Sequence, residues 1–160
     1  MAGSPALIER FDAVRREILG QPRDLDALRE EVVKMRHKMR DHLGSSESAR
    51  REGWFHLKQD AGGMVDIEFL CQYAVLAMSH ETPELLEWSD NMRILETLES
   101  TGRLEGEDAR RLREAYLAYR NAAHRNALTK GDARVREQDF HGYRQAVCHL
   151  WRTWLEPADT

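Results

Sequence analysis

The chain has 160 residues, enough for one domain with its own hydrophobic core, and 32% of them are charged. The formal net charge of −4 argues against a nucleic-acid-binding face built on bulk positive charge. No apolar run approaches the roughly 18 residues of a membrane span and the N-terminus lacks a signal-peptide core, so we expect a soluble, unexported protein with no membrane partner.

Two amphipathic helices are predicted first. Apolar residues at 3/4 spacing predict a helix that ends at Gly20 and Pro22; they are Ile8, Phe11, Val14 and Ile18. Asp24 is the predicted N-cap of a second, long helix that ends at Gly44. Its apolar stripe consists of Leu28, Val32, Met35, Met39 and Leu43.

The middle of the chain is predicted to be a loop, a short extended piece and a helix. Residues 44–53 are rich in Ser, Arg and Glu, which predicts a solvated, mobile loop. Residues 54–57 around Phe55 are the only strand candidate. A turn at 60–63 then leads into a helix over about 64–78, because the apolar residues of this segment recur at helical spacing.

Helical patterns continue to the end of the sequence. Thr82 before Pro83 predicts a helix start, Ser89 is the predicted cap of the next segment, and Gly102 closes it. Two further apolar stripes predict helices over about 105–128 and 140–155. We therefore expect an all-α fold: a single helical domain over residues 1–160, with five to seven helices and one short extended segment near Phe55.

The two cysteines, Cys71 and Cys148, lie far apart and have no neighbouring cysteine. This spacing predicts neither a zinc site of the CxxC type nor a disulfide framework. A reduced, cytoplasmic setting follows, and no metal ligand set is predicted.

Asp66 and Glu68 resemble the paired acids of two-metal nucleotidyl enzymes. On a helix they are separated by about 200° of rotation, so they do not chelate one ion together. On a strand they would share a face, so this exclusion depends on the helix prediction. For Asp66 we expect a first-turn carboxylate that complements the helix dipole. No catalytic residue is predicted in the chain.

Lys58, Gly62 and Gly63 form the one candidate binding site. The glycines allow a close backbone approach just before the N–H groups of a helix, and a lysine lies upstream, so together they could hold a nucleotide phosphate. The alternative is a plain turn, because no GxxxxGK[ST] pattern is present.

Four segments carry a resemblance to a known family. FHLKQDAGGMVDIEFLCQYAVL, WSDNMRILETLE, YRNAAHRNAL and LREEVVKMRHKMRDHL resemble the C-terminal helical part of bacterial glutamine synthetase adenylyltransferase/adenylyl-removing enzymes. The resemblance extends from about Leu7 to about Leu155, and it implies distant kinship with the helical module of PII uridylyltransferases. The family motif is met by Lys58, Gly62, Gly63, Met64, Asp66, Ile67, Glu68, Phe69, Gln72 and Tyr73.

The resemblance implies that this chain is an accessory fragment of a larger enzyme. The family's chemistry belongs to two nucleotidyltransferase domains, each with a Gly-Ser turn and a strand-borne DxD, and this sequence contains no such run. It implies that the parent uses ATP and Mg²⁺ to attach AMP to glutamine synthetase in nitrogen regulation, removes it by phosphorolysis, and responds to the PII protein and glutamine. The fragment itself is then expected to be inactive and to hold no cofactor.

Three roles remain open for the fragment. It could help shape the nucleotide cleft of its own nucleotidyltransferase domain, with Lys58 and the glycine pair at the edge, or contact glutamine synthetase. It could instead be a pure interaction module that docks the PII protein, glutamine synthetase or neighbouring domains without touching ATP. A stand-alone ligand-binding bundle is the third alternative.

Overall fold

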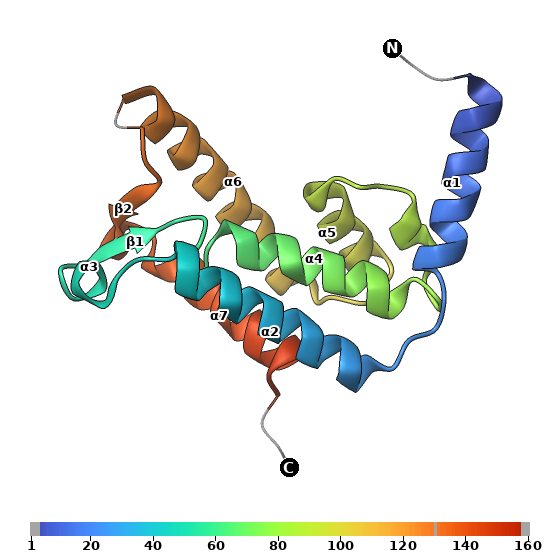
Figure 1. Ribbon diagram of the computed structural model, residues 1–160, viewed down its shortest axis with the longest axis horizontal. Helices are drawn as coiled ribbons and strands as arrows, with labels where there is room; N and C mark the ends of the chain where they lie inside the picture. Colours follow the sequence, from blue (N-terminus) through green and yellow to red (C-terminus); the bar gives the residue numbers. More distant parts are fainter. Residues whose placement is uncertain (1–3, 130, 158–160) are drawn as a thin grey trace.

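The computed structural model describes residues 4–129 and 131–157, and in this part the chain forms seven α-helices and one two-stranded sheet (Figure 1). The helices are α1 (Pro5–Leu19), α2 (Leu25–Leu43), α3 (Glu47–Arg51), α4 (Met64–Met78), α5 (Asn91–Ser100), α6 (Gly106–Thr129) and α7 (His141–Leu155). The strands are β1 (Trp54–His56) and β2 (Arg134–Arg136), and the two short 3-10 helices are η1 (Pro83–Leu86) and η2 (Glu137–Asp139). The expectation of an all-α fold is confirmed.

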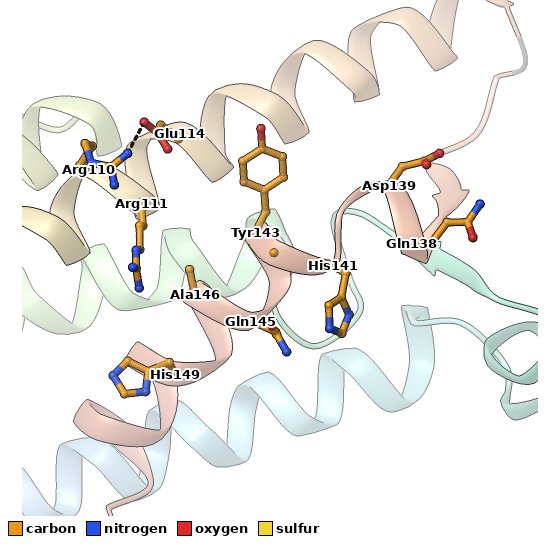
Figure 2. Close-up of a pocket in the computed structure, with 11 residues that line it drawn as sticks. Arg110, Arg111, Glu114, Gln138, Asp139, His141, Tyr143, Gln145, Ala146 and His149 are labelled. Carbon is orange, nitrogen blue, oxygen red and sulfur yellow. Dashed lines mark hydrogen bonds and ion pairs between the residues drawn. The ribbon is translucent and has the colours of Figure 1, made fainter.

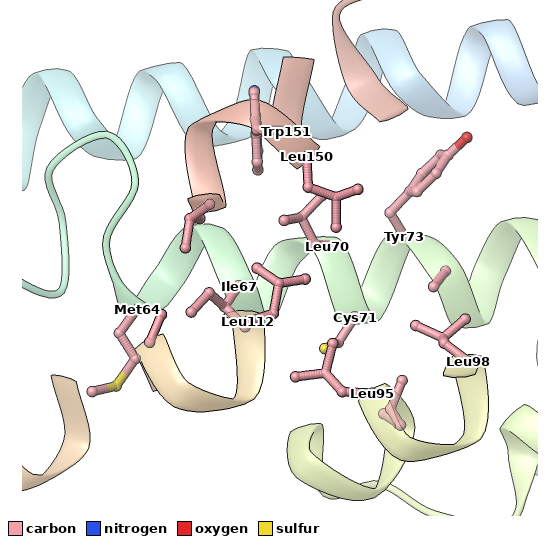
Figure 3. Packing of buried hydrophobic residues seen from close by; sticks show 14 of the residues in the cluster. Met64, Ile67, Leu70, Cys71, Tyr73, Leu95, Leu98, Leu112, Leu150 and Trp151 are labelled. Carbon is pink, nitrogen blue, oxygen red and sulfur yellow. The ribbon is translucent and has the colours of Figure 1, made fainter. Parts of the chain in front are cut away.

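Helix α4 lies at the centre of the bundle, where it contacts α2, α5, α6 and α7 (Figure 1). It begins at Met64 and ends at Met78, the bounds that the sequence predicts. Its buried side chains face several directions and interlock with those of the surrounding helices, as Figure 3 shows for Ile67, Leu70 and Trp151. A helix that is buried on most sides is apolar nearly all round, which explains the density of apolar residues in this segment.

Helix α2 is confirmed, but only part of its expected apolar stripe faces the core: Leu28 and Val32 pack against it. Met35 is 61% exposed and Leu43 is also exposed, whereas the side chain of Arg36 is completely buried. Asp24 caps the helix as predicted, because its side chain accepts from the N–H groups of Asp26 and Ala27. At this turn of the helix the side chain of Arg36 is therefore buried, whereas the apolar pattern predicted that Met35 would be.

Helix α1 extends away from the bundle (Figure 1). Its apolar face is uncovered. Phe11 is 72% exposed, and the other members of the stripe are exposed too: Leu7, Ile8, Val14 and Ile18. The C-terminal part of the helix is fixed in place, since Arg15 Nη1 donates to the Leu86 carbonyl at 2.5 Å and Arg23 Nη1 donates to the Leu76 carbonyl at 3.1 Å.

The segment 44–53 is not wholly a loop, because it contains the short helix α3, which Ser46 caps. Asp60 anchors the start of the segment: its carboxylate accepts from the Ser45 backbone N–H at 2.7 Å and from the Ser45 hydroxyl at 2.6 Å. The mobility of this segment stays a prediction. The strand β2 was not predicted; it pairs antiparallel with β1 and places Phe55 opposite Val135.

Two predicted caps differ from the observed ones. Thr82 does precede η1, but its hydroxyl makes no capping bond and instead accepts from Arg103 Nε at 2.8 Å. The cap of α5 is Asp90 rather than Ser89, because the Asp90 carboxylate accepts from the N–H groups of Met92 and Arg93. The prediction for Ser89 was wrong by one residue.

None of the helices described is long and apolar enough to cross a membrane.

Candidate functional site

The centre of the KQDAGGMVDIEF motif is a buried ion pair. Arg36 Nε on α2 lies 2.5 Å from Asp66 Oδ1 in the first turn of α4, and Arg40 Nη2 lies 3.4 Å from the same oxygen. The remaining Arg36 donors bind Gln59, through its backbone carbonyl at 2.6 Å and its side-chain oxygen at 3.4 Å. One carboxylate therefore compensates two guanidinium groups from the neighbouring helix.

The glycine turn closes around the same carboxylate. The Gly62 N–H donates to Asp66 Oδ2 at 2.7 Å, and the Gly62 carbonyl accepts from the Tyr119 hydroxyl of α6, also at 2.7 Å. The Gly63 N–H donates to the Asp60 carbonyl at 2.9 Å. Both glycines are buried. The turn is thus hydrogen-bonded to α4 and α6, and Asp66 connects it to the arginines of α2.

Close packing explains why glycine occupies both positions. Gly62 has a φ of +81°, and a Cβ there would lie 2.8 Å from the Arg144 carbonyl oxygen and 2.8 Å from Cys148 Sγ on α7. A Cβ on Gly63 would lie 2.7 Å from the Leu57 carbonyl oxygen. A side chain would therefore clash with backbone atoms at either residue, and at Gly62 the left-handed conformation adds strain.

The first N–H groups of α4 are also occupied. The Met64 N–H donates to the Leu57 carbonyl at 2.7 Å, and the Val65 N–H donates to the Lys58 carbonyl at 3.1 Å. A phosphate at a helix N-terminus binds free N–H groups. The glycine turn consequently offers no free donor at its centre. Of the three predicted phosphate ligands, Gly62 and Gly63 are buried and only Lys58 is exposed to solvent.

Asp66 and Glu68 have different environments. Asp66 is buried in the ion-pair cluster, whereas Glu68 is half-buried. Burial raises the pKa of the Glu68 carboxyl, and the nearby Lys58 and Arg36 oppose that rise. Within residues 4–129 and 131–157 no group of three or more His, Cys, Asp or Glu side chains is arranged to hold a metal ion.

His56 supports the turn from the other side. Its Nδ1 accepts from the backbone N–H groups of Gln59, at 3.1 Å, and Lys58, at 3.3 Å. Burial lowers the pKa of the His56 imidazole, and the Asp60 carboxylate opposes that shift. A neutral imidazole is the form that can accept at Nδ1, so the hydrogen bonds and the pKa shift agree.

A polar depression of about 600 Å³ lies between α6 and α7, away from the glycine turn (Figure 2). Arg110 and Arg111 line it, but both guanidinium groups already pair with Glu107, and Arg110 also pairs with Glu114. His141 pairs with Glu137 at 2.7 Å. Because both arginines are already compensated by carboxylates, the depression has no strong preference for an anion.

The sequence prediction missed several residues at this site, among them Arg36, Arg40, His56 and Tyr119. A signal existed for Arg36, since Leu28, Val32 and Arg36 follow one another at intervals of four on one helix face. No comparable signal existed for Tyr119, which lies 57 residues from its partner Gly62.

Comparison with known proteins places the chain in a family. Residues 29–152 match the family described as GlnD PII-uridylyltransferase. The chain is 48% identical to the bifunctional glutamine synthetase adenylyltransferase/adenylyl-removing enzyme of Acinetobacter baylyi, across all of this chain and 17% of that enzyme. The enzyme of the same name from Pseudomonas aeruginosa is 52% identical across 95% of this chain and 16% of its own length.

A third relative of the same name, from Pseudomonas syringae pv. tomato, is 51% identical across 94% of this chain and 16% of its own length. The chain thus spans about a sixth of the length of the curated relatives it matches. It belongs to the GlnD PII-uridylyltransferase family, as a helical segment of the kind found in bifunctional glutamine synthetase adenylyltransferase/adenylyl-removing enzymes.

Proposed function

We propose that this chain is the C-terminal accessory helical domain of a bifunctional glutamine synthetase adenylyltransferase/adenylyl-removing enzyme, and that it acts mainly by docking. The observation that carries the proposal is the match of the chain, at 48% and 52% identity, to about a sixth of two such enzymes. Under this proposal, ATP and Mg²⁺ bind to nucleotidyltransferase domains of the same cytoplasmic enzyme, outside the present chain.

The state of Asp66 supports a role without catalysis for the shared motif. Its carboxylate accepts from Arg36, Arg40 and the Gly62 N–H, so its oxygens are already engaged inside the protein. Withdrawing such a carboxylate to bind a metal ion would leave a buried arginine unpaired, which is strongly unfavourable. The motif is better suited to holding α2 and α4 together.

The uncovered face of α1 supports docking. Five large apolar side chains on one helix are exposed: Leu7, Ile8, Phe11, Val14 and Ile18. Contiguous exposed apolar surface is typical of protein contacts. We propose that this face packs against the nucleotidyltransferase domain of the same polypeptide, and that the domain also contributes to contacts with glutamine synthetase and the PII protein.

A double substitution on α1 tests the docking role. Phe11→Ser with Val14→Ser should leave the unfolding of the isolated chain almost unchanged, because both side chains are exposed there. In the full-length enzyme the same change should lower adenylylation of glutamine synthetase several-fold and make this segment easier to release by limited proteolysis. Leu128→Ser, on an equally exposed residue of α6, is the matched control. Unaltered activity and proteolysis in the full-length double variant would count against docking through α1.

A second candidate role keeps Lys58 at the edge of the nucleotide cleft. The observation in its favour is the solvent-exposed side chain of Lys58 beside the turn, where an ammonium group could meet a triphosphate as a point charge. In the full-length enzyme, Lys58→Ala should then raise the KM for ATP in adenylylation and leave phosphorolytic removal largely intact. Lys38→Ala, on the exposed face of α2, is the control. Unchanged adenylylation kinetics would remove Lys58 from the cleft.

Binding experiments separate the accessory domain from a pure interaction module. If the segment only docks partners, it should co-purify with glutamine synthetase or the PII protein, and Lys58→Ala should have no effect on ATP use. If it only completes the cleft, the Lys58 effect should appear without a direct partner contact. Failure of both would contradict the proposed function.

A further inference from the structure

An apolar groove of about 290 Å³ lies between α2 and α4, which run side by side in the bundle (Figure 1). Each helix contributes three apolar side chains to its walls: Leu28, Val32 and Met35 from α2, and Phe69, Tyr73 and Leu76 from α4. Both sets follow one another at intervals of four and three, so each forms a ridge along one face of its helix. Met35 is 61% exposed, so the groove is open to solvent at this residue.

The floor of the groove is held in place by contacts with the rest of the fold. The Tyr73 ring lies 6.2 Å from the ring of Trp154 on α7, and its hydroxyl accepts from Arg29 Nε at 3.2 Å. The guanidinium carbon of Arg36 lies 5.8 Å from the centre of the Phe69 ring. A groove whose floor is already ordered costs less conformational entropy when a partner binds.

The dimensions of the groove suit one face of a third helix. In each wall the first and last apolar residues are seven positions apart, which is about 10 Å along a helix. At roughly 30 Å³ per water-sized group, the volume holds about ten non-hydrogen atoms, or about two to three aliphatic side chains. Apolar side chains at positions i, i+4 and i+7 of a helix match both the length and the volume. A small molecule would be better held by a more enclosed pocket.

The one charged side chain that lines the groove is negative. It belongs to Glu31 on α2, which makes no hydrogen bond or ion pair within residues 4–129 and 131–157. The two arginines next to the floor already have carboxylate partners, since Arg36 pairs with Asp66 and Arg29 pairs with Asp26. The charge left at the groove is therefore that of a carboxylate.

A second carboxylate lies beside the groove on the opposite wall. Glu68 precedes the lining residue Gln72 by one turn on the same side of α4, and it is half-buried. It makes no hydrogen bond or ion pair with any other residue that the structure describes, although Lys58 is near enough to lower its pKa. Carboxylates on both walls favour a partner that carries basic residues beside its apolar ones.

We propose that this groove binds a basic amphipathic helix of a partner protein. Its apolar side chains at i, i+4 and i+7 fill the groove, and its Lys or Arg side chains pair with Glu31 and Glu68. The proposal accounts for the exposure of Met35, because an unbranched and adaptable side chain suits a surface that packs against another helix. It is independent of docking through α1, because α1 contributes no residue to the groove.

Two designed peptides of about 20 residues test the groove. Both carry leucine at i, i+4 and i+7 on an alanine background, and they differ only in having lysine or glutamate at the flanking positions. In NMR spectra of the 160-residue chain with ¹³C-methyl-labelled methionine, the lysine peptide should shift the Met35 methyl signal saturably and leave that of Met92, on α5, unmoved. Fluorescence anisotropy should show that the lysine peptide binds about threefold to tenfold more tightly than the glutamate peptide at low salt.

Matched variants locate the binding. Met35→Ser should weaken binding of the lysine peptide by roughly tenfold or more, because an apolar contact is lost, whereas Leu128→Ser on α6 should have no effect. Glu31→Gln should reduce the preference for the lysine peptide by about twofold to fivefold. Glu30→Gln changes the charge of the neighbouring exposed residue, which does not line the groove, and should keep the preference.

Three results would overturn the proposal: no saturable shift of the Met35 methyl signal with the lysine peptide, equal affinity for the two peptides, or unchanged affinity in Met35→Ser. A Met35 shift on dilution of the peptide-free chain would assign the groove to a second copy instead. Saturable binding of indole as tight as that of the peptide would assign it to a small molecule. Phe11→Ser with Val14→Ser should bind the peptide as the unaltered chain does, which separates this test from that of α1.

Discussion

Arg36 Nε lies 2.5 Å from Asp66 Oδ1, and the two side chains are 0% and 2% exposed. The pair joins α2 to the first turn of α4, next to the glycine turn. Charges this deeply buried are tolerated only when they are paired and hydrogen-bonded, and both conditions hold here. The acidic residue of the motif therefore organises the bundle.

Removing the charge of Asp66 should destabilise the protein strongly. Asp66→Asn leaves the buried Arg36 without its counter-ion, and breaking a buried pair in this way costs roughly 3–5 kcal/mol. Urea unfolding followed by circular dichroism measures the change. Asp26→Asn is the control, because Asp26 pairs with Arg29 at the surface, where the carboxylate is 95% exposed. Similar effects from both substitutions would contradict the structural role of the Arg36–Asp66 pair.

Two glycines of similar conformation should respond very differently to alanine. Gly62 and Gly53 have φ values of +81° and +84°, but only at Gly62 would a Cβ meet other atoms, at 2.8 Å. Both substitutions impose a left-handed conformation, which costs roughly 1–2 kcal/mol, and Gly62→Ala adds a steric term of about 1–3 kcal/mol. Thermal unfolding of the two variants measures the difference. Equal destabilisation would show that α7 does not pack closely against the turn.

The hydroxyl of Tyr119 should contribute measurably to stability. Tyr119→Phe removes the buried donor to the Gly62 carbonyl and leaves that carbonyl without this partner, at a cost of about 1–3 kcal/mol. Tyr143→Phe is the matched control, since Tyr143 packs against Tyr119 through its ring at 6.2 Å. Chemical denaturation of both variants measures the contrast, and a null result for Tyr119→Phe would mean that the bond is replaced by solvent.

Stability should fall as the pH is lowered through the titration of His56. Burial lowers the pKa of its imidazole below 6.5 in the folded state, so the unfolded chain binds the proton more readily. The stabilisation is therefore present above about pH 6.5 and is lost as the pH falls through the folded pKa. Protonation also converts Nδ1 from an acceptor to a donor, which breaks its bonds to the N–H groups of Lys58 and Gln59.

Urea unfolding between pH 7.5 and pH 5 measures this dependence. His56→Asn should reduce the slope of stability against pH, whereas His124→Asn, on the exposed side of α6, should keep it. An NMR titration of the imidazole gives the folded pKa directly. A value at or above 6.5 would rule out the proposed effect of burial.

The sequence by itself determined the longer helices, because their signals are local, but it did not predict the short helix α3. The bounds of α4, the Asp24 cap and the end of α1 at Gly20 follow from apolar spacing and capping chemistry within a few residues. The family also follows from sequence, since several ordered motifs match at once.

Only the tertiary structure decided how those helices are used. The spacing of α2 places Arg36 on the face of Leu28 and Val32, but it does not reveal the partner that lets a charged side chain be buried there, because Asp66 lies 30 residues away on α4. The strand β2 and the bond from Tyr119 to Gly62 likewise depend on contacts between distant segments. Two glycines before a helix suggested a phosphate-binding turn. In the folded chain, however, their N–H groups donate to Asp66 and Asp60. Hydrogen bonds between buried polar groups of distant segments thus decide which donors of the motif stay free to bind a ligand.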